Sequence, residues 1–469
     1  MTATASHPAA LRPLLWLVAA GIFMQMLDTT IVNTALPAMA RNLGESPLQM
    51  QSVVMSYALT AAVFIPASGW VADRFGTRKV FLGAVVTFTL GSLLCALAPT
   101  LPLLVAARIV QGMGGAMLLP VGRLAVLRSV SREQYLGAIS FIAIPAMIGP
   151  LLGPTLGGWL VRVASWHWIF LINLPIGALA LLAALRIMPD HRASERTRFD
   201  LLGYGLLAAG MVLLSLALDG VADRAAGHVL VLLLGVFGLA ALAGYWLHAA
   251  RVPQPLFPLD LFAIAAYRIG LIGNLFARIG SGAMPFLIPL LLQVGLGLDA
   301  MRAGMMMIPV ALAGMASKRA AVALVDRLGY RRVLMVNTVL VGLMMAGFAL
   351  IGAGQPLWLR IVQFAAFGAV NSLQFTVMNT VTLRDLDGEH ASAGNSLLSM
   401  VMMLATGFGV AVAGSLLAAF NEHLTMHGAM AALRATFACM GAVTLASTLI
   451  FWQLVEPPRR YGKVDMPAE

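Results

Sequence analysis

The chain is built from long apolar runs, each about as long as a helix that crosses a lipid bilayer. Such a helix needs roughly 20 mainly apolar residues. Backbone groups in lipid must be paired within their own segment, and the runs lack the alternation of barrel strands, so we predict helices. The sequence predicts an all-α polytopic membrane protein with 14 transmembrane helices. The expected spans are residues 14–36, 51–72, 80–98, 102–127, 136–161, 167–188, 199–218, 228–248, 267–295, 303–325, 333–353, 357–383, 394–420 and 431–455.

Composition supports this interpretation and excludes several other classes of protein. Of 469 residues, 60% are hydrophobic and 10% are charged, and the mean hydropathy is +0.90. A soluble chain carries about 25% charged residues. An ordinary cytosolic enzyme, a secreted domain and a disordered protein are therefore excluded. The longest stretches between spans, such as 189–198 and 249–266, leave no room for a domain outside the membrane.

Basic residues gather on one side of the expected membrane. With the N-terminus in the cytoplasm, 20 of the 30 Lys and Arg residues lie on the cytoplasmic side, six lie outside and four lie within spans. Cytoplasmic loops of membrane proteins are enriched in Lys and Arg. We therefore expect both termini in the cytoplasm. The net charge of +11 then indicates contact with anionic lipid headgroups rather than with nucleic acid.

A charged loop motif occurs twice. Asp73-Arg74 is followed by Gly76 and two basic residues, and Asp326-Arg327 is followed by Gly329 and two basic residues, 253 positions later (326 minus 73). Repetition at a long offset, in the same order relative to the spans, indicates a duplicated six-helix unit of the kind found in transporters. The charges can bridge helix ends, so we interpret both loops as a conformational latch between two halves, with a solvated basic loop on the cytoplasmic side as the alternative. The latch residues are Gly69, Asp73, Arg74, Gly76, Arg78, Lys79, Asp326, Arg327 and Arg331.

The offset is too long for six helices alone, so two additional helices are expected between the halves. They correspond to the spans at 199–218 and 228–248, which are nearly devoid of polar residues and are expected to face lipid. The expected order of helices is 6+2+6. The predicted domains are an N-terminal half at 1–188, a linker region with the two additional helices at 189–266, a C-terminal half at 267–455 and a cytoplasmic tail at 456–469.

Asp28 is a carboxylate well inside the first span. An ionised carboxylate in lipid is costly, so such a residue usually faces a cavity and has a partner. Arg108 on the fourth span is expected at a similar depth, which makes the two residues a plausible charge pair. Proton binding at Asp28 would then be coupled to substrate exchange. A static structural pair is the alternative.

Other polar residues inside spans are candidates for a substrate cavity. Arg278 lies too deep in the ninth span to reach the membrane surface easily, and it could contact an anion or pair with Asp28. For several of the others, hydrogen bonding between helices is the alternative. The candidate cavity residues are Gln25, Asn33, Asn274, Arg278, Lys318, Asn371, Gln374, Asn395 and Ser399.

Glycines recur every four residues on the fifth span, so they share one helix face and allow a neighbouring helix to approach closely. Prolines beside them add a local bend. We interpret this motif as a seal or hinge in the outer half of the span, with generic tight packing as the alternative. Its residues are Gly149, Pro150, Gly153, Pro154, Gly157 and Gly158.

These motifs resemble those of the major facilitator superfamily, and more closely its fourteen-helix drug:proton antiporter branch. The resemblance rests on the loop at 69–79, the first-helix motif at 27–37, the fourth-helix motif at 108–115, the fifth-helix motif at 149–158 and the segment 166–175. It implies the major facilitator fold, a proton-coupling role for Asp28 and an exporter, since the fifth-helix motif marks exporters in that family. It also implies a multi-pass protein of the bacterial cytoplasmic (inner) membrane.

We therefore expect a secondary transporter that exports small molecules in exchange for protons by alternating access, with multidrug efflux implied by the resemblance. Four interior cations against one carboxylate favour a second hypothesis, export of an organic anion such as citrate or its metal chelate. A passive channel or receptor is a third. No nucleophile motif, nucleotide-binding loop or spaced histidine cluster is present in the sequence, so we expect no enzyme, no cofactor and no metal. The expected partners are substrate, protons and lipids, and the expected active form is a monomer.

Overall fold

The structure is a computed structural model of the chain. It describes residues 8–130, 132–192, 198–220, 227–386, 390–423 and 428–454. The predicted tail at 456–469 lies outside these residues. Every regular element in the described part is a helix. The helices are α1 (Pro8–Leu43), α2 (Gln51–Phe75), α3 (Thr77–Leu97), α4 (Leu101–Leu127), α5 (Arg132–Val163), α6 (Trp168–Leu171), α7 (Asn173–Ile187), α8 (Leu201–Gly220), α9 (His228–Ala249), η1 (Leu259–Phe262), α10 (Ala265–Gly282), α11 (Met284–Leu290), η2 (Leu291–Gly295), α12 (Ala300–Met305), α13 (Ile308–Leu328), α14 (Tyr330–Gly347), η3 (Phe348–Leu350), α15 (Leu357–Leu383), α16 (Ala391–His423), α17 (Gly428–Ala446) and α18 (Thr448–Trp452).

Several short helices are continuous pieces of longer membrane-length segments. Within the described residues, 13 segments are long and apolar enough to cross a membrane. α5 adds another helix of 32 residues, with prolines inside it. The all-helical architecture predicted from the apolar runs is confirmed. The number of membrane-length helices is close to the 14 expected from the sequence.

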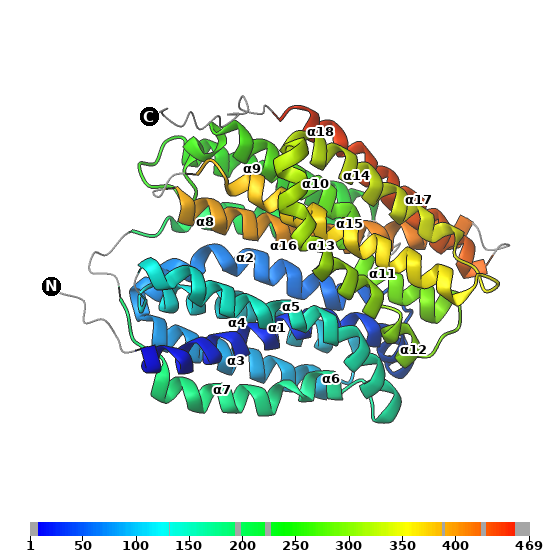
Figure 1. Ribbon diagram of the computed structural model, residues 1–469, viewed down its shortest axis with the longest axis horizontal. Coiled ribbons are helices and arrows are strands. Elements are labelled where there is room, and N and C mark those ends of the chain that lie inside the picture. The colour runs from blue at the N-terminus through cyan, green and yellow to red at the C-terminus, as the bar shows by residue number, and fades with distance from the viewer. Residues whose placement is uncertain are drawn as a thin grey trace, which may run out of the picture.

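The helices run roughly parallel to one another in two layers (Figure 1). In the first layer α1 packs on α5 and α3 packs on α4. In the second, α13 packs on α15, α14 on α17 and α10 on α16. The layers meet where α2 packs on α16 and where α5 packs on α12. The division into domains at the boundaries proposed above stays a prediction.

The repeated loop motif has the same backbone structure in both places. Gly76 has a φ of 94° and Gly329 has a φ of 81°, a region that glycine enters without a steric penalty. The N–H of each glycine donates to a carbonyl four residues earlier, Ala72 at 2.9 Å and Val325 at 2.8 Å. We call the end of the bundle that carries these turns the Gly76 end, and the opposite end, which carries Trp166, the Trp166 end.

The two helices expected to face lipid differ in their packing. In the most apolar stretch of α9, 11% of the residues are buried, against 28% in α8. α8 lies against both α2 and α16, where the two layers meet. At its last turn the Gln51 amide of α2 donates to Asp219 at 2.9 Å, and the Ser415 hydroxyl of α16 donates to the Leu218 carbonyl at 3.1 Å. α9 is therefore a peripheral helix, whereas α8 also joins the two layers.

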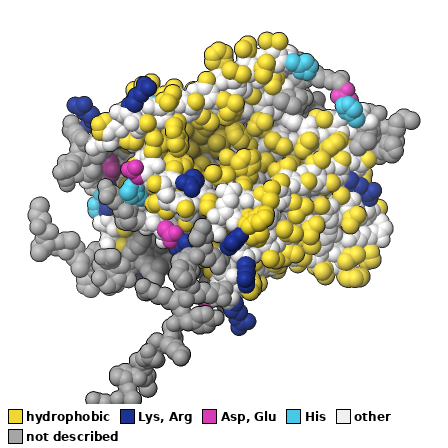
Figure 2. All heavy atoms as spheres, turned by 90° about the horizontal axis from the view of Figure 1, so that it is seen from above, with side chains coloured by type: hydrophobic (Ala, Val, Ile, Leu, Met, Phe, Trp, Pro, Cys, Tyr) yellow, Lys and Arg dark blue, Asp and Glu magenta, His cyan; other side chains and the backbone are white. Residues whose placement is uncertain are grey.

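The outer surface matches a protein surrounded by lipid. Hydrophobic side chains cover most of the face in Figure 2, and charged side chains are sparse on it. Large apolar side chains are exposed along α9, including Val229, Leu232 and Phe237, each more than 60% exposed. In water such a surface would cause aggregation. In a bilayer it is the surface that contacts the hydrocarbon chains.

Candidate proton-coupling site

Asp28 lies in the middle of α1 and is fully buried. The Thr29 and Thr30 hydroxyls bond back to backbone carbonyls of the same helix, so they do not compete for the carboxylate. Glycines of α5 let that helix approach α1 on either side of Asp28 along the chain. A Cβ atom at Gly149 would lie 2.9 Å from the backbone nitrogen of Leu27, and one at Gly157 would lie 2.7 Å from the carbonyl of Ile31. The glycine motif thus fixes the helix that carries the carboxylate.

Arg108 of α4 is the ionic partner of Asp28. Its Nη1 lies 2.6 Å from Oδ2 of Asp28, and the two side chains are 1% and 0% exposed. Its Nε donates to the Val53 carbonyl at 3.2 Å. The guanidinium lies over the Tyr57 ring, 4.3 Å from its centroid. A buried charge pair is tolerated when hydrogen bonds satisfy its remaining atoms, and this pair meets that condition.

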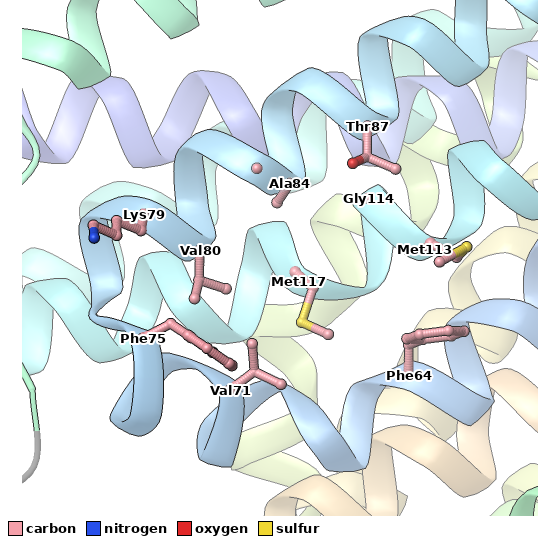
Figure 3. Close-up of a pocket in the computed structure, with 11 residues that line it drawn as sticks. Phe64, Val71, Phe75, Lys79, Val80, Ala84, Thr87, Met113, Gly114 and Met117 are labelled. Carbon is pink, nitrogen blue, oxygen red and sulfur yellow. The ribbon is translucent and has the colours of Figure 1, made fainter.

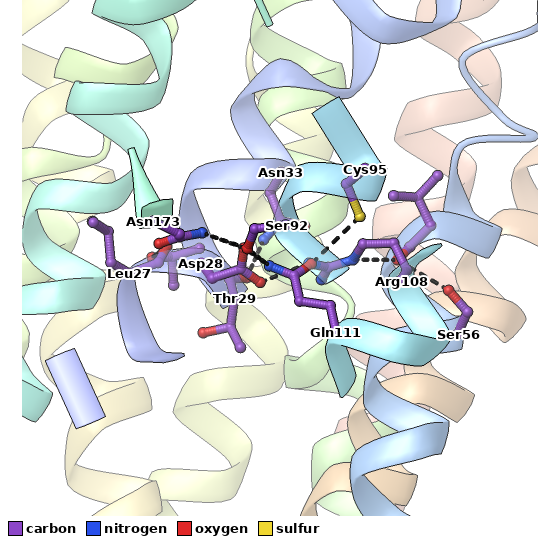
Figure 4. A network of polar contacts seen from close by, with 12 residues as sticks. Leu27, Asp28, Thr29, Asn33, Ser56, Ser92, Cys95, Arg108, Gln111 and Asn173 are labelled. Carbon is purple, nitrogen blue, oxygen red and sulfur yellow. Dashed lines mark hydrogen bonds and ion pairs between the residues drawn. The ribbon is translucent and has the colours of Figure 1, made fainter. Parts of the chain in front are cut away.

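Two amides complete the network, Gln111 on the same helix as Arg108 and Asn173 on α7 (Figure 4). Gln111 donates to Oδ1 of Asp28 at 2.8 Å and to Ser92 at 2.7 Å, while its own Oε1 accepts from Arg108 at 2.6 Å. Asn173, the first residue of α7, donates to Oδ1 of Asp28 at 3.3 Å and to Ser92 at 3.2 Å. The carboxylate therefore accepts bonds from three side chains on two helices, all of them buried.

The sequence reasoning missed Gln111, Asn173 and Ser92. Gln111 follows Arg108 by three residues, so helical spacing places both on one face of α4, which is a signal that could have identified it. Asn173 falls within the conspicuous segment 166–175 but has no pattern that points to a partner. Nothing in the sequence distinguishes Ser92, since a hydroxyl in a membrane helix commonly bonds to its own backbone.

Two candidate cavity residues lie on the same helix as Asp28. Gln25 and Asn33 are 3% and 5% exposed. The Asn33 amide donates to the carbonyl of Thr29 at 3.0 Å. In the described part of the structure, the side-chain oxygens of Gln25 and Asn33 have no hydrogen-bond partner. A buried amide oxygen of this kind is a position at which water or a ligand can bind.

Arg278 of α10 occupies a different environment in the second layer. Its Nε donates to Asn274 at 3.4 Å, and its guanidinium lies over the Phe375 ring, 4.1 Å from the centroid. Within the described residues its Nη2 has no hydrogen-bond partner, and no carboxylate pairs with it. Asp28 pairs with Arg108, so the structure does not join Arg278 to Asp28 as one hypothesis suggested.

The remaining cavity candidates fall into two groups. Asn274 and Gln374 are buried between helices: Asn274 donates to Thr382 at 3.3 Å, and Gln374 donates to Thr338 at 2.7 Å and accepts from Asn337 at 2.8 Å. These contacts favour helix packing as their role. The other residues are partly or fully exposed and are available to a ligand. They are Lys318, Asn371, Asn395 and Ser399.

The fifth-helix motif also contacts the second layer. A Cβ atom at Gly158 would collide with the Ala300 carbonyl of α12. Thr155, between the motif's residues, donates to the Gly304 carbonyl at 3.2 Å. Nearby, Gln293 of η2 donates to the Thr34 carbonyl of α1 at 2.8 Å. These contacts hold the two layers together toward the Trp166 end.

The first latch loop packs within its own layer in this structure. Asp73 pairs with Arg128, at the end of α4, at 2.5 Å, and the two side chains are about one-third exposed. Arg78 donates to the Leu185 carbonyl of α7. His191 bonds to Ser129 at 3.1 Å. The pKa of the His191 imidazole is lowered mainly by partial burial and to a lesser extent by the positive charge of Arg128. The loop therefore joins the ends of α2, α4 and α7, and its role between layers stays a prediction.

Comparison with known proteins places this geometry in a family. The chain matches the Major Facilitator Superfamily over residues 18–391 and, in an overlapping match, 270–468. It is 50% identical over 448 residues to the "Putative multidrug resistance protein MdtD" of Serratia proteamaculans, covering 95% of this chain and 94% of that protein. It is 52% identical over 417 residues to the protein of the same name from Pectobacterium atrosepticum, covering 89% of each chain.

Solved structures agree at the level of the fold. The POT family transporter PepTSo superposes with a TM-score of 0.70 at 12% identity, covering 95% of this chain and 97% of that one. A D-xylose–proton symporter superposes with a TM-score of 0.67 at 16% identity, covering 95% and 98%. The family assignment itself rests on the sequence matches. The chain is a multi-pass membrane transporter that belongs to the Major Facilitator Superfamily.

Proposed function

We propose that this transporter exports small molecules in exchange for protons, and that Asp28 is the group that binds and releases the proton. The observation that carries the proposal is the fully buried ion pair of Asp28 with Arg108, in which Gln111 bonds to both partners. An ionisable residue inside the membrane is costly to keep, and such residues commonly serve proton or substrate pathways.

The chemistry of the pair gives a physical route to coupling. With Asp28 ionised, the two charges neutralise each other and the network is satisfied. A proton on Asp28 removes the negative charge and leaves the Arg108 guanidinium as an uncompensated cation in a dry site, which is unfavourable. The packing of α1 against α4 is then destabilised until the cation finds another partner or water. Protonation thus changes the relative free energy of two arrangements of the helices, as proton coupling requires.

We further propose that the Gly76 end faces the cytoplasm of a bacterial inner membrane. The excess of basic residues at the loops of this end supports that orientation. Export then requires the contacts toward the Trp166 end to open, including the bond from Thr155 to the Gly304 carbonyl and the bond from Gln293 to the Thr34 carbonyl. Both are single hydrogen bonds between the layers and can be broken and re-formed during a cycle.

Two classes of substrate remain as candidates. The relatives named for multidrug resistance favour hydrophobic drugs. Arg278 favours an organic anion, such as citrate or a metal chelate, because this half-buried cation has a buried nitrogen with no hydrogen-bond partner and lacks a carboxylate partner within the described residues. An anionic substrate at Arg278 would supply the missing countercharge, and the Phe375 ring beside it would favour a planar group.

The test is proton release from inverted membrane vesicles that contain either the wild-type protein or Asp28→Asn. Each is challenged in turn with a lipophilic cation and with a citrate-type anion. We expect wild type to release protons with one substrate class and Asp28→Asn to release none. Asp299→Asn makes the same chemical change at an exposed helix cap and serves as the matched control, with wild-type release expected.

The outcomes separate the hypotheses. Release with the cation alone identifies a drug exporter, and release with the anion alone identifies an anion exporter. Normal proton release by folded, inserted Asp28→Asn contradicts the role proposed for Asp28. Substrate flux that ignores the proton gradient in wild type contradicts coupled transport altogether and favours a passive channel.

A further inference from the structure

A groove opens on the outer surface of the first layer, where α2 and α3 diverge from their shared turn (Figure 3). The two helices make little contact with each other, and both pack on α4, which forms the floor. The groove has a volume of about 440 Å³. That volume lies within the range of about 300–1,000 Å³ that is typical of small-molecule sites.

The lining of the groove is apolar along most of its length. Phe64, Val71 and Phe75 come from α2, and Met113 and Met117 come from α4. Phe75 and Met113 are 53% and 37% exposed, so the groove is open on its outer side. In a bilayer that side faces hydrocarbon. The occupant of such a groove must have an apolar part that competes with lipid chains.

Lys79 is the charged residue of the lining and lies at the Gly76 end of the groove (Figure 3). Its side chain is exposed, and within the described residues no carboxylate pairs with it. It sits on the first turn of α3, just inside the loop that joins α2 to α3. This is the level at which phospholipid headgroups lie, and basic side chains at this level attract anionic lipids.

We propose that this groove is a binding site for an anionic phospholipid, with one acyl chain between α2 and α3 and the phosphate on the Lys79 ammonium. The lining and charge of the site match the two parts of such a lipid: an apolar groove, and at its headgroup end a cation with which no carboxylate of the described residues pairs. A zwitterionic lipid offers the same acyl chain but less net negative charge to Lys79.

Gly83 gives the groove its open middle. A Cβ atom built at Gly83 has no other atom within 4 Å, so the position borders empty space rather than a packed helix. Gly114 on the floor differs, because a Cβ there would lie 2.7 Å from the Ala84 carbonyl of α3. A larger side chain at Gly83 would therefore fill the groove without displacing α3 from α4.

A lipid in this site would act on the first latch loop. Lys79 lies in the motif that contains Asp73, Arg74 and Gly76, and a phosphate there would neutralise one of its cations. The charge balance of the loop would then depend on the lipid composition of the membrane.

The test uses native mass spectrometry of the detergent-solubilised full chain, with phosphatidylglycerol or phosphatidylcholine added at equal concentration. We expect wild type to retain phosphatidylglycerol preferentially. Lys79→Gln should weaken its retention about fivefold, the equivalent of the roughly 1 kcal/mol that a basic side chain contributes near an anionic surface. Gly83→Leu should reduce retention of both lipids at this site.

Matched controls separate the groove from general effects of charge and size. Arg74→Gln removes a cation from the same loop outside the groove lining, and Gly235→Leu enlarges another glycine that has no atom near its Cβ position. Both should retain phosphatidylglycerol as wild type does. If Gly83→Leu does not fold, the retention of phosphatidylglycerol by Lys79→Gln, compared with its retention by Arg74→Gln, still tests the proposal.

Three results would overturn the proposal. The first is equal retention of the two lipids by wild type. The second is an equal loss of phosphatidylglycerol in Lys79→Gln and Arg74→Gln. The third is displacement of the retained phosphatidylglycerol by a lipophilic cation such as tetraphenylphosphonium, which would make the groove a site for a transport substrate.

Discussion

Two arginines inside the helix bundle of this transporter differ in how their charge is balanced, Arg108 being fully buried and Arg278 half-buried. Arg108, in the first layer, has a carboxylate at 2.6 Å, a backbone carbonyl and a glutamine. Arg278, in the second layer, has one long bond to Asn274 and the face of Phe375. The first arginine belongs to a closed, neutral network. The second keeps a nitrogen with no hydrogen-bond partner among the described residues, and we infer that its countercharge comes from outside the protein.

The largest expected effect on stability follows from breaking the first site. Arg108→Gln leaves Asp28 without its cation in a dry interior. Removing one partner of a buried ion pair costs about 3–5 kcal/mol. Thermal unfolding in detergent should therefore show a marked loss of stability for Arg108→Gln. A melting temperature close to that of wild type would mean that the pair contributes little and that water reaches it.

The same substitution at the second site should have a much smaller effect. Arg278→Gln removes a half-buried charge that no carboxylate of the described residues pairs with, which is favourable, and a cation–π contact worth about 0.5–2 kcal/mol, which is unfavourable. The two terms oppose each other. Thermal unfolding of Arg278→Gln and Arg108→Gln under the same conditions tests this difference directly. Equal destabilisation of the two variants would mean that the two arginines do not differ in how their charge is balanced.

A double substitution sharpens the account of the first site. Asp28→Asn combined with Arg108→Gln removes both charges and leaves amides that can bond to each other. Replacing a buried ion pair by neutral groups is often close to neutral in stability. The double variant should thus be more stable than Arg108→Gln alone by at least about 2 kcal/mol. Additive losses in the double-mutant cycle would contradict a direct interaction between the pair.

The helix that carries Asp28 can be displaced without touching a charge. A methyl group from Gly149→Ala would lie 2.9 Å from the Leu27 backbone, so α1 and α5 must move apart. Overpacking of this kind costs about 1–3 kcal/mol. Gly137→Ala on the same helix is the matched control, because its Cβ position has no atom within 4 Å. Unfolding should distinguish the two variants, and equal stability would show that the α1–α5 contact is not tight.

The smallest effect is expected at the surface of the first layer. Asp73 and Arg128 form a short pair, but both side chains are about one-third exposed. Pairs of this kind contribute about 1 kcal/mol or less, and salt screens them. Asp73→Asn should change the free energy of unfolding by that amount at low salt and by less at high salt. A larger loss that persists at high salt would mean that the pair is shielded from solvent.

The helices, the two glycine turns and the Asp28–Arg108 pair could be predicted from the sequence, because each depends on the pattern of residues within a short segment of the chain. The apolar runs have the length of the helices, and the repeated loops contain Gly76 and Gly329, both of which have a positive φ. Asp28 and Arg108 were matched by depth in the membrane. Each of these predictions depends only on where a residue lies along its own helix, and that position can be read directly from the sequence.

The partners across helices could not be predicted in the same way. Periodicity shows which face of a helix is polar but not which neighbour that face meets. Asn173 reaches both Asp28 and Ser92, Gln374 reaches α14, and Phe375 covers Arg278, because of how the helices are rotated and packed. These contacts decide whether a buried polar residue belongs to a closed network or keeps a free group, and they come from the tertiary structure alone.

The most direct test of the central claim separates proton coupling from substrate exchange. Proteoliposomes with wild type or Asp28→Asn are assayed for substrate accumulation driven by an imposed pH gradient, and for exchange of labelled against unlabelled substrate with no gradient. The account predicts that Asp28→Asn loses accumulation and keeps exchange, because the carrier still binds substrate and changes conformation without a proton. Gradient-driven accumulation by Asp28→Asn at the wild-type level would contradict it.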